Sequence, residues 1–156
     1  MIVSNATPLI AFARIGELAL LERIVEQLTI PEAVWQEVTG VPDRVGSEAI
    51  RQATWIDVKR VSEVPADLLV LLDRGEAEVI ALAEEQGADE VIIDERAARA
   101  IAITRGLSVI GSAGLLVRAK DRHLITEVRP LLSRMHEAGM RYSQRFFDSL
   151  LEALGE

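Results

Sequence analysis

The sequence predicts an α/β fold in which a mostly parallel central sheet of about five strands is covered by helices on both faces. Short apolar runs typical of buried strands alternate along the chain with amphipathic helical patterns. The chain has 156 residues, 49% of them apolar, which is enough for one hydrophobic core. We find no internal repeat, low-complexity tract or linker. Residues 1–156 are therefore expected to form a single domain, which the helices from about residue 120 cap or extend.

The strands are expected where short apolar runs occur, at residues 2–3, 28–30, 55–61, 91–93 and 107–110. Helices are expected where apolar residues recur with helical spacing, at residues 17–27, 32–38, 47–52, 67–72, 76–86 and 95–105. A further helix opens at Thr7-Pro8, because proline fits a first helical turn. Gly106 is expected to end the helix at residues 95–105 as its C-cap. Residues 111–114 are predicted to be a tight turn that leads into another helix. The rest is predicted to be helical, at 125–137 and 144–154.

The chain has no cysteine, which excludes disulfides, thiolate metal sites and a cysteine nucleophile, and which fits a reducing compartment. Its first ten residues contain neither the basic region nor the long apolar run of a signal peptide. The longest apolar stretches, such as Leu68 to Leu72, are too short to span a bilayer. A cytoplasmic protein with no membrane association is therefore expected.

Charge is distributed unevenly along the chain. The formal net charge of −8 disfavours nucleic acid at first sight, because phosphate attracts positive surface. However, residues 1–95 contain 7 Lys/Arg and 19 Asp/Glu, a net charge of −12, whereas residues 96–145 contain 10 Lys/Arg and 3 Asp/Glu, a net charge of +7. This asymmetry is either scattered surface charge or a basic region that contacts a polyanion.

Four polar residues could form a metal site. Asn5 and Asp94 directly follow apolar strands, so their side chains are expected at the carboxyl edge of the sheet, where α/β proteins bind ligands. Glu37 lies late in the helix after the second strand, and Glu76 begins the helix before the fourth. Three carboxylates and an amide oxygen suit Mg²⁺ or Mn²⁺, bound as one or two ions. Such an ion would offset the repulsion among the carboxylates and activate water.

Each of these residues also has a structural interpretation, which we favour when the residue is taken alone. Asp94 fits the N-cap of the following helix. Asp73 and Glu76 fit a capping box, Glu37 a solvated helix face, and Asn5 a turn. Composition and spacing leave both interpretations open.

A resemblance to a known family favours the functional interpretation. Ile2–Ile10 (IVSNATPLI) resembles the first strand and helix of PIN domains. Pro31–Val38 (PEAVWQEV), Gly75–Ala83 (GEAEVIALA) and Ile93–Arg99 (IDERAAR) resemble the second, third and fourth motifs of that family. Gly111–Leu116 (GSAGLL) also matches, within an uncharacterised branch related to VapC-type toxins. The resemblance runs from about Ile2 to Leu116, in order and at suitable spacing.

The resemblance implies a PIN fold and metal-dependent cleavage of RNA by an endoribonuclease, often a toxin neutralised by a small antitoxin protein. Glu37, Glu76 and Asp94 fall on acidic metal-binding positions of the family. Asn5 falls where the first acid is most often Asp; its amide oxygen can coordinate but brings no charge, so weaker metal binding is expected. Thr7 falls near a hydroxyl position and would hydrogen-bond a metal-bound water.

Charged neighbours of these residues are assigned by helical geometry. Glu78 and Glu95 are predicted to point to solvent, because they lie two and one residues from Glu76 and Asp94. Arg96 and Arg99 begin the basic segment, and they either meet RNA phosphates or neutralise the acidic cluster.

The carboxyl-terminal segment is predicted to be an amphipathic helix with Phe146, Phe147, Leu150 and Leu151 on its apolar side. We expect this side to pack on the core first. A self-association face, which would make a homodimer, or a docking face for an inhibitory partner comes second. The two tryptophans are predicted to be core anchors, and the two histidines are too isolated to be ligands.

Three functions remain to be compared. The leading one is a Mg²⁺- or Mn²⁺-dependent ribonuclease. The alternative is a catalytically weakened PIN-like module that binds RNA or protein, and Asn5 motivates it. A small phosphatase or nucleotide hydrolase is weakest, because the sequence offers no suitable nucleophile and no phosphate-cradling glycine-rich loop.

Overall fold

The computed structural model describes residues 1–156 and has a five-stranded parallel sheet with the strand order β3-β2-β1-β4-β5. In the central strand, Val3 lies opposite Thr29 of β2 on one side and Val91 of β4 on the other. The predicted α/β fold class is confirmed. The strands are β1 (Ile2–Ser4), β2 (Leu28–Pro31), β3 (Ile56–Lys59), β4 (Glu90–Ile92) and β5 (Val109–Ile110).

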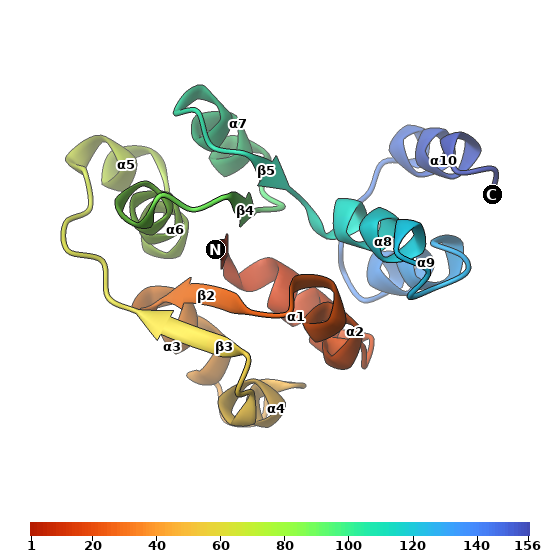
Figure 1. Cartoon of the computed structure of the whole chain (residues 1–156), viewed down its shortest axis with the longest axis horizontal. Helices are drawn as coiled ribbons and strands as arrows, with labels where there is room; N and C mark the ends of the chain where they lie inside the picture. Colours follow the sequence, from red (N-terminus) through yellow and green to blue (C-terminus); the bar gives the residue numbers. More distant parts are fainter.

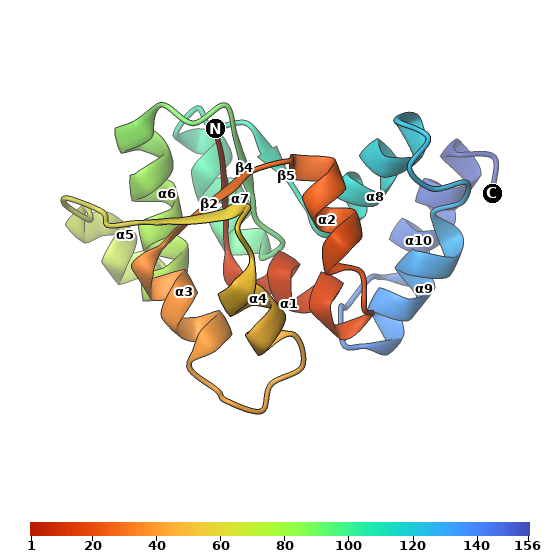
Figure 2. The ribbon, with the colours of Figure 1, turned by 60° about the horizontal axis from the view of Figure 1, so that its bottom comes forward.

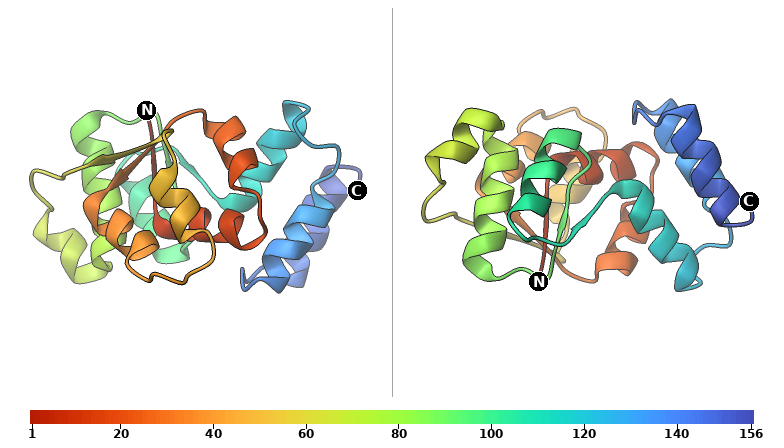
Figure 3. Two further views of the ribbon diagram at one scale, coloured as in Figure 1. Left: turned by 90° about the horizontal axis from the view of Figure 1, so that it is seen from below. Right: turned by 90° about the horizontal axis from the view of Figure 1, so that it is seen from above.

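Helices cover both faces of the sheet. Figure 1 shows α5 and α6 on one side and α1 and α2 on the other, while α8, α9 and α10 gather at the end of the molecule that holds the C-terminus. In both views of Figure 3, α9 and α10 lie side by side. The helices are α1 (Ala6–Arg14), α2 (Leu18–Val25), α3 (Glu32–Thr39), α4 (Ser47–Gln52), α5 (Ala66–Leu71), α6 (Arg74–Gln86), α7 (Arg96–Thr104), α8 (Ser112–Asp121), α9 (Arg129–Glu137) and α10 (Gln144–Ala153).

The strand order defines where a ligand would bind. The chain proceeds from β1 outward to β2 and β3, then returns to β4 and β5 on the other side of β1. The winding direction therefore switches between β1 and β4, and parallel sheets bind ligands at the carboxyl edge beside such a switch. Figure 2 shows β1 running from the N-terminus at the top to the start of α1 below. The residues that follow β1 and β4 meet at this lower edge.

One hydrophobic cluster of 37 buried residues holds the sheet and its helices together. The buried strands β1, β2 and β4 supply its centre, and the edge strand β3 is more exposed. None of the ten helices combines the length and the apolar character that a membrane-crossing helix needs. The carboxyl-terminal helices belong to the same cluster through Leu131, Leu132, Met135 and Leu151.

Three predicted boundaries are wrong for physical reasons. Residues 111–114 do not form a turn, because α8 begins at Ser112 with Gly111 as its N-cap. A Cβ on Gly114 would lie 2.7 Å from Cγ1 of Ile110, so that glycine permits close packing of helix on strand. Helix α9 begins at Arg129 and not at residue 125, with Pro130 in its first turn. The N-cap of α7 is Glu95 and not Asp94.

Candidate functional site

Asn5 occupies the centre of the carboxyl edge. It follows β1, and its backbone N–H donates to the carbonyl of Ile92 in β4 across 3.0 Å. The residue is only 4% exposed. Its Nδ2 donates to Oε2 of Glu95 across 2.9 Å, which turns its Oδ1 away from Glu95. Asn5 is thus the N-cap residue of α1, but its side chain makes no capping bond and faces the other polar residues of the edge.

Oxygen atoms from three elements meet around the backbone of Gly75. A Cβ at this position would lie 3.3 Å from Oε2 of Glu37, 3.5 Å from Oδ1 of Asp73 and 3.7 Å from Oδ1 of Asn5. Gly75 lies in the first turn of α6, Glu37 in α3 and Asn5 after β1. The glycine therefore leaves open the space between a helix start and two oxygen-bearing side chains.

Asp73 and Glu76 form the capping box that the sequence pattern allowed. Oδ1 of Asp73 accepts the backbone N–H of Glu76 at 2.8 Å, and Oε2 of Glu76 accepts that of Asp73 at 3.1 Å. Each carboxylate uses one oxygen for the cap in these contacts. The structural interpretation of Glu76 thus holds, and the cap also fixes two carboxylates beside Gly75.

Glu78 does not point to solvent, so that prediction is wrong. The residue is 7% exposed, and its carboxylate accepts the backbone N–H of Ala33 and Nε of Arg74, each at 3.0 Å. Ala33 lies in the first turn of α3, where backbone N–H groups lack helical partners. Glu78 thereby fastens the start of α3 to α6, and this contact positions Glu37 one helical turn further on.

Glu95 points into the site, so the prediction that it faces solvent is also wrong. Its carboxylate accepts Nδ2 of Asn5 and the hydroxyl of Thr7, which fixes it against the start of α1. The reason is the end of the preceding strand. Strand β4 ends at Ile92 and α7 begins at Arg96, so Asp94 and Glu95 lie in an extended link, where consecutive side chains point to opposite sides.

Asp94 faces the start of α8. Its Oδ1 accepts the backbone N–H of Ser112 at 2.8 Å, and its Oδ2 accepts the Ser112 hydroxyl. Nη1 of Arg99 donates to the carbonyl of Ile93 at 2.8 Å, and a Cβ on Gly111 would touch both Asp94 and Arg99. The predicted metal role of Asp94 stays a prediction. Of the two arginines, Arg99 lies beside Asp94, as its neutralising interpretation expects.

No cation forms a salt bridge with the candidate metal-binding carboxyl groups of this edge, although the charges of Arg44 and Arg99 act on Glu37 and Asp94. Burial raises the pKa of Glu37, with the nearby charge of Asp73 as the next cause. Burial also raises the pKa of Glu76 and of Asp94, and the charge of Glu95 adds to both effects. Of the salt bridges of the protein, the one between Arg74 and Glu78 borders this edge, and the others lie elsewhere. Uncompensated carboxylates that raise one another's pKa are the arrangement that an added cation would relieve.

The oxygen atoms of these residues are suitable ligands for a hard divalent ion, although the side chains do not form a complete coordination site. Carboxylate and amide oxygens are the ligands that Mg²⁺ and Mn²⁺ take in proteins. No group of three or more Asp, Glu, His or Cys side chains lies close enough together to hold a metal ion in the present positions. The Glu37 carboxylate takes part in no hydrogen bond, whereas Asp73 and Glu76 are held by their capping box and Asp94 by Ser112.

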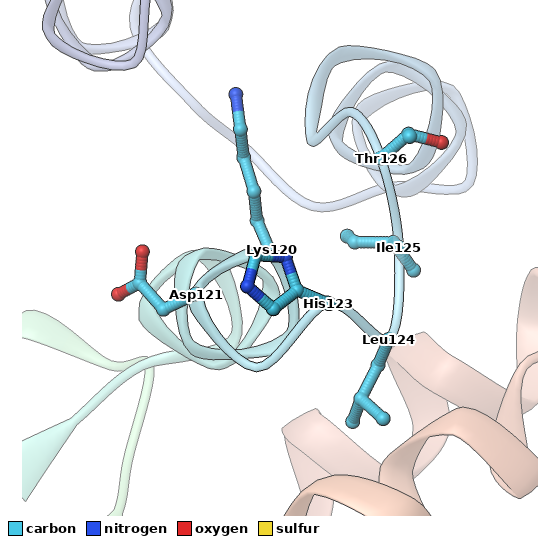
Figure 4. A pocket seen from close by; sticks show the side chains of 6 residues that line it. All are labelled: Lys120, Asp121, His123, Leu124, Ile125 and Thr126. Atoms are coloured by element: carbon cyan, nitrogen blue, oxygen red, sulfur yellow. The ribbon is translucent and has the colours of Figure 1, made fainter.

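A separate hollow of about 530 Å³ lies between the end of α8 and the start of α9, lined by residues 120–126 apart from Arg122 (Figure 4). Lys120 beside it is engaged through its Nζ with Glu156 at 2.8 Å. His123 and Asp121 are the remaining ionisable side chains of its lining. This hollow holds none of the residues of the carboxyl edge, and we do not assign it to the same site.

The comparison with known families agrees with this arrangement. A parallel α/β sheet with polar residues gathered at its carboxyl edge defines a class of ligand-binding or catalytic domains. The chain matches the PIN domain family over residues 1–156. It therefore belongs to the PIN domain family, whose members are generally nucleases that act with divalent metal ions. No curated protein matches the chain significantly.

Proposed function

We propose that the protein is a Mg²⁺- or Mn²⁺-dependent endoribonuclease that hydrolyses RNA phosphodiester bonds with one or two ions. The observation that supports this most is the set of uncompensated oxygen ligands from separate elements around Gly75. The site comprises Asn5, Glu37, Glu76 and Asp94, as the sequence predicted. To these we add two acids, Glu95 and Asp73, which sequence reasoning did not assign to it.

The residues of the chain divide into those that would hold the ion and those that prepare them. Glu37, Glu95 and the amide oxygen of Asn5 would hold it, with Glu76 and Asp94 as further ligands. When bound, the ion lowers the pKa of a water molecule and neutralises charge on the phosphate. Thr7 acts here through Glu95, whose carboxylate it fixes, and not through water as the sequence had indicated. Gly75 keeps the space between these oxygens free of a side chain.

The experiment is RNA cleavage by the purified protein with Mn²⁺, with Mg²⁺ and with EDTA. Changing an outer residue of a metal site typically lowers activity about 10- to 100-fold, so Glu95→Gln, at a direct ligand, is expected to lower it more than about 100-fold. Glu76→Gln is expected to abolish metal-dependent cleavage as well. Glu22→Gln, an exposed acid on α2, serves as the control and should cleave normally.

Asp94→Asn tests the assignment of that residue separately. The sequence predicts that this variant loses cleavage and stays folded. Retained cleavage would limit Asp94 to holding Ser112 at the start of α8. If neither ion supports cleavage by a folded wild-type protein, the nuclease proposal fails.

The alternative function is a PIN-like module that binds RNA or protein without cutting. Asn5 favours it, because its amide contributes no charge to the binding of a cation. A calorimetric Mn²⁺ titration separates the two functions. Measurable affinity that falls in Glu37→Gln supports the nuclease, and absence of affinity supports the binding module.

We further propose that the protein is a toxin held by a small antitoxin, and that it forms a homodimer in the cytoplasm. Three consecutive exposed apolar residues support a partner, because Leu69, Val70 and Leu71 on α5 are 43%, 83% and 63% exposed. They lie just before Asp73, so a protein bound there would border the site. Light scattering of the purified protein measures the dimer, and growth arrest on expression measures the toxin role.

A further inference from the structure

Three aromatic rings stack at the carboxyl-terminal end of the molecule, and the proposed chemistry does not use them. The ring centroids of His136 and Tyr142 are 6.4 Å apart, with planes inclined by 25°, and those of Tyr142 and Phe146 are 5.6 Å apart, inclined by 23°. Tyr142 stands in the middle, because His136 and Phe146 do not pair with each other. We call these three residues the aromatic stack.

Only the outer members of the aromatic stack stand clear of the hydrophobic core, because Tyr142 between them is half-buried and packs against that core. Phe146 is 44% exposed and His136 is exposed, so the two outer members contact solvent. The next residue, Phe147, packs against the core together with Leu150. Aromatic rings are scarce in this chain, with 3 Phe, 2 Trp and 1 Tyr in all, and both tryptophans also pack against the core. Phe146 is thus the only Phe, Tyr or Trp among the exposed large hydrophobic residues.

The backbone holds the aromatic stack in place. The Ser143 hydroxyl accepts the backbone N–H of Phe146 at 3.1 Å and thereby fixes the first turn of α10. Nη1 of Arg14 donates to the carbonyl of Ala138 at 3.2 Å and ties the link between α9 and α10 to α1. A ring platform held in this way loses little conformational freedom when a ligand stacks on it.

Two free cations flank the rings. Arg141 and Arg145 directly precede Tyr142 and Phe146, and both are exposed. Neither arginine takes part in any of the side-chain hydrogen bonds or salt bridges of the structure, unlike Arg134, which contacts Ile15 and Glu17. Their charges are therefore available to a ligand. Exposed rings beside unpaired cations are the composition of surfaces that bind single-stranded nucleic acid, with bases on the rings and phosphates on the cations.

The aromatic stack lies close to the carboxyl edge. Burial raises the pKa of Tyr142 well above its usual value, and the charge of Asp94 raises it further. Helix α9 also contacts α8, and Ser112 at the start of α8 holds Asp94. A strand of RNA on the rings would thus continue toward the acidic residues.

We propose that the aromatic stack, with Arg141 and Arg145, binds unpaired bases of single-stranded RNA and leads the strand to the acidic edge. This inference rests on the proposed ribonuclease for its purpose, but the binding itself can be measured without cleavage. A chain with a net charge of −8 can thus meet a polyanion at this place, where two unpaired arginines lie beside the rings. Unpaired bases are required, since bases within a duplex do not offer their faces.

The test uses the full chain in EDTA, so that no metal-dependent cleavage occurs, with single-stranded RNA oligonucleotides that contain 2-aminopurine. Stacking of this base on a ring quenches its fluorescence. Base stacking contributes about 1–3 kcal/mol per base, so Phe146→Leu is expected to weaken binding about 5- to 100-fold and to reduce the quenching. Phe146→Trp keeps a ring and should retain both. The thermal unfolding of each variant checks that it remains folded.

Charge variants separate the arginines from the rings. Arg141→Gln is expected to weaken RNA binding and to lower the salt dependence of the binding constant by the equivalent of about one phosphate contact. The quenching at saturation should equal that of the wild type. Arg23→Gln, an exposed and unpaired arginine on α2, is the matched control and should bind as the wild type does. A duplex of the same sequence should bind more weakly and be indifferent to Phe146→Leu.

The outcomes distinguish this inference from the proposed function. Equal binding and quenching by Phe146→Leu and wild type would overturn the inference, even if the protein cleaves RNA. The inference would also be overturned if Phe146→Leu bound RNA normally but no longer self-associated. The rings would then form a contact between protein molecules. Ring-dependent RNA binding by a protein that no metal activates would uphold the inference and refute the nuclease.

Discussion

Acidic residues lie at both ends of the sheet, but the two ends differ in whether these residues form salt bridges. At the amino end, Glu90 is the first residue of β4. Its carboxylate accepts hydrogen bonds from both terminal nitrogens of Arg118, each at 2.7 Å. The two side chains are 16% and 26% exposed, and the contact raises the pKa of the arginine. This end borders a hollow of about 680 Å³ whose lining includes Glu90 and Lys59. The acid here is neutralised by the protein itself.

At the carboxyl end, none of the candidate metal-binding acids forms a salt bridge, although two arginines lie near two of them. Asp73, Glu76 and Glu95 find backbone N–H groups, an amide and a hydroxyl as partners, and these contacts fix the carboxylates without neutralising them. Buried charged groups are normally paired with an opposite charge within the protein. An acidic group without such a partner at a ligand-binding edge therefore indicates that a bound ligand supplies the compensating charge. Comparison of the two ends therefore separates structural acids from functional ones.

Among the changes that test the contrast between the two ends, Gly75→Ala at the carboxyl end is expected to have the largest effect. The new methyl group would lie 3.3 Å from Glu37, in the space between the oxygens of three elements. Alanine is the better helix former by about 1 kcal/mol, so the variant should be at least as stable as the wild type. Cleavage and Mn²⁺ affinity should nevertheless fall more than about 10-fold. Thermal unfolding and calorimetry measure the two quantities, and unchanged Mn²⁺ affinity would remove Gly75 from the site.

The next effect concerns the amino end. Glu90→Gln leaves Arg118 without its two charged contacts and should lower the free energy of unfolding by about 1–2 kcal/mol. Cleavage should stay within about 2-fold of the wild type, because a structural acid supports only the fold. Glu48→Gln is the matched control, since its pair with Arg51 is exposed and should contribute less than about 1 kcal/mol. A large loss of activity with intact stability in Glu90→Gln would contradict the comparison.

The sequence predicted the fold well because its signals are local. Buried strands appear as apolar runs, and the helix at residues 47–52 has the predicted bounds. Gly114 was read as part of a turn because its reason is not local: it lies against Ile110 in the preceding strand. Only the folded chain shows that contact.

The candidate site could be proposed from the sequence only in outline, and the roles of its residues stay predictions. Asn5 and Glu37 could be placed by motif and by strand ends. Whether Asp94 or Glu95 faces Asn5 depends on the last residue of β4, and an error of one residue inverts the side on which each side chain lies. The burial of Glu78 follows from the packing of α3 on α6, which no local pattern reveals. Local periodicity thus predicts the helices and strands, whereas the direction in which each side chain points at the sheet edge is known only from the tertiary structure.

The smallest expected effect is the stability of Glu37→Gln in the absence of divalent ions. Burial and Asp73 raise the pKa of Glu37 in the folded state above its ordinary value of 4.5. Below that ordinary pKa the carboxyl is protonated in both states and has no effect. As pH rises above it, the unfolded chain ionises first, so the folded state loses stability until its own raised pKa is passed. Above that point the loss remains constant.

Glutamine cannot ionise, so Glu37→Gln should melt slightly higher than the wild type at neutral pH, and the difference should vanish as pH falls to about 4.5. Mn²⁺ should reverse the order at neutral pH, because it stabilises only the chain that keeps the carboxylate. Thermal unfolding at several pH values, with and without Mn²⁺, measures both differences. A variant that is less stable than the wild type without metal would mean that Glu37, like Glu90, is compensated within the protein, and the contrast between the two ends of the sheet would not hold.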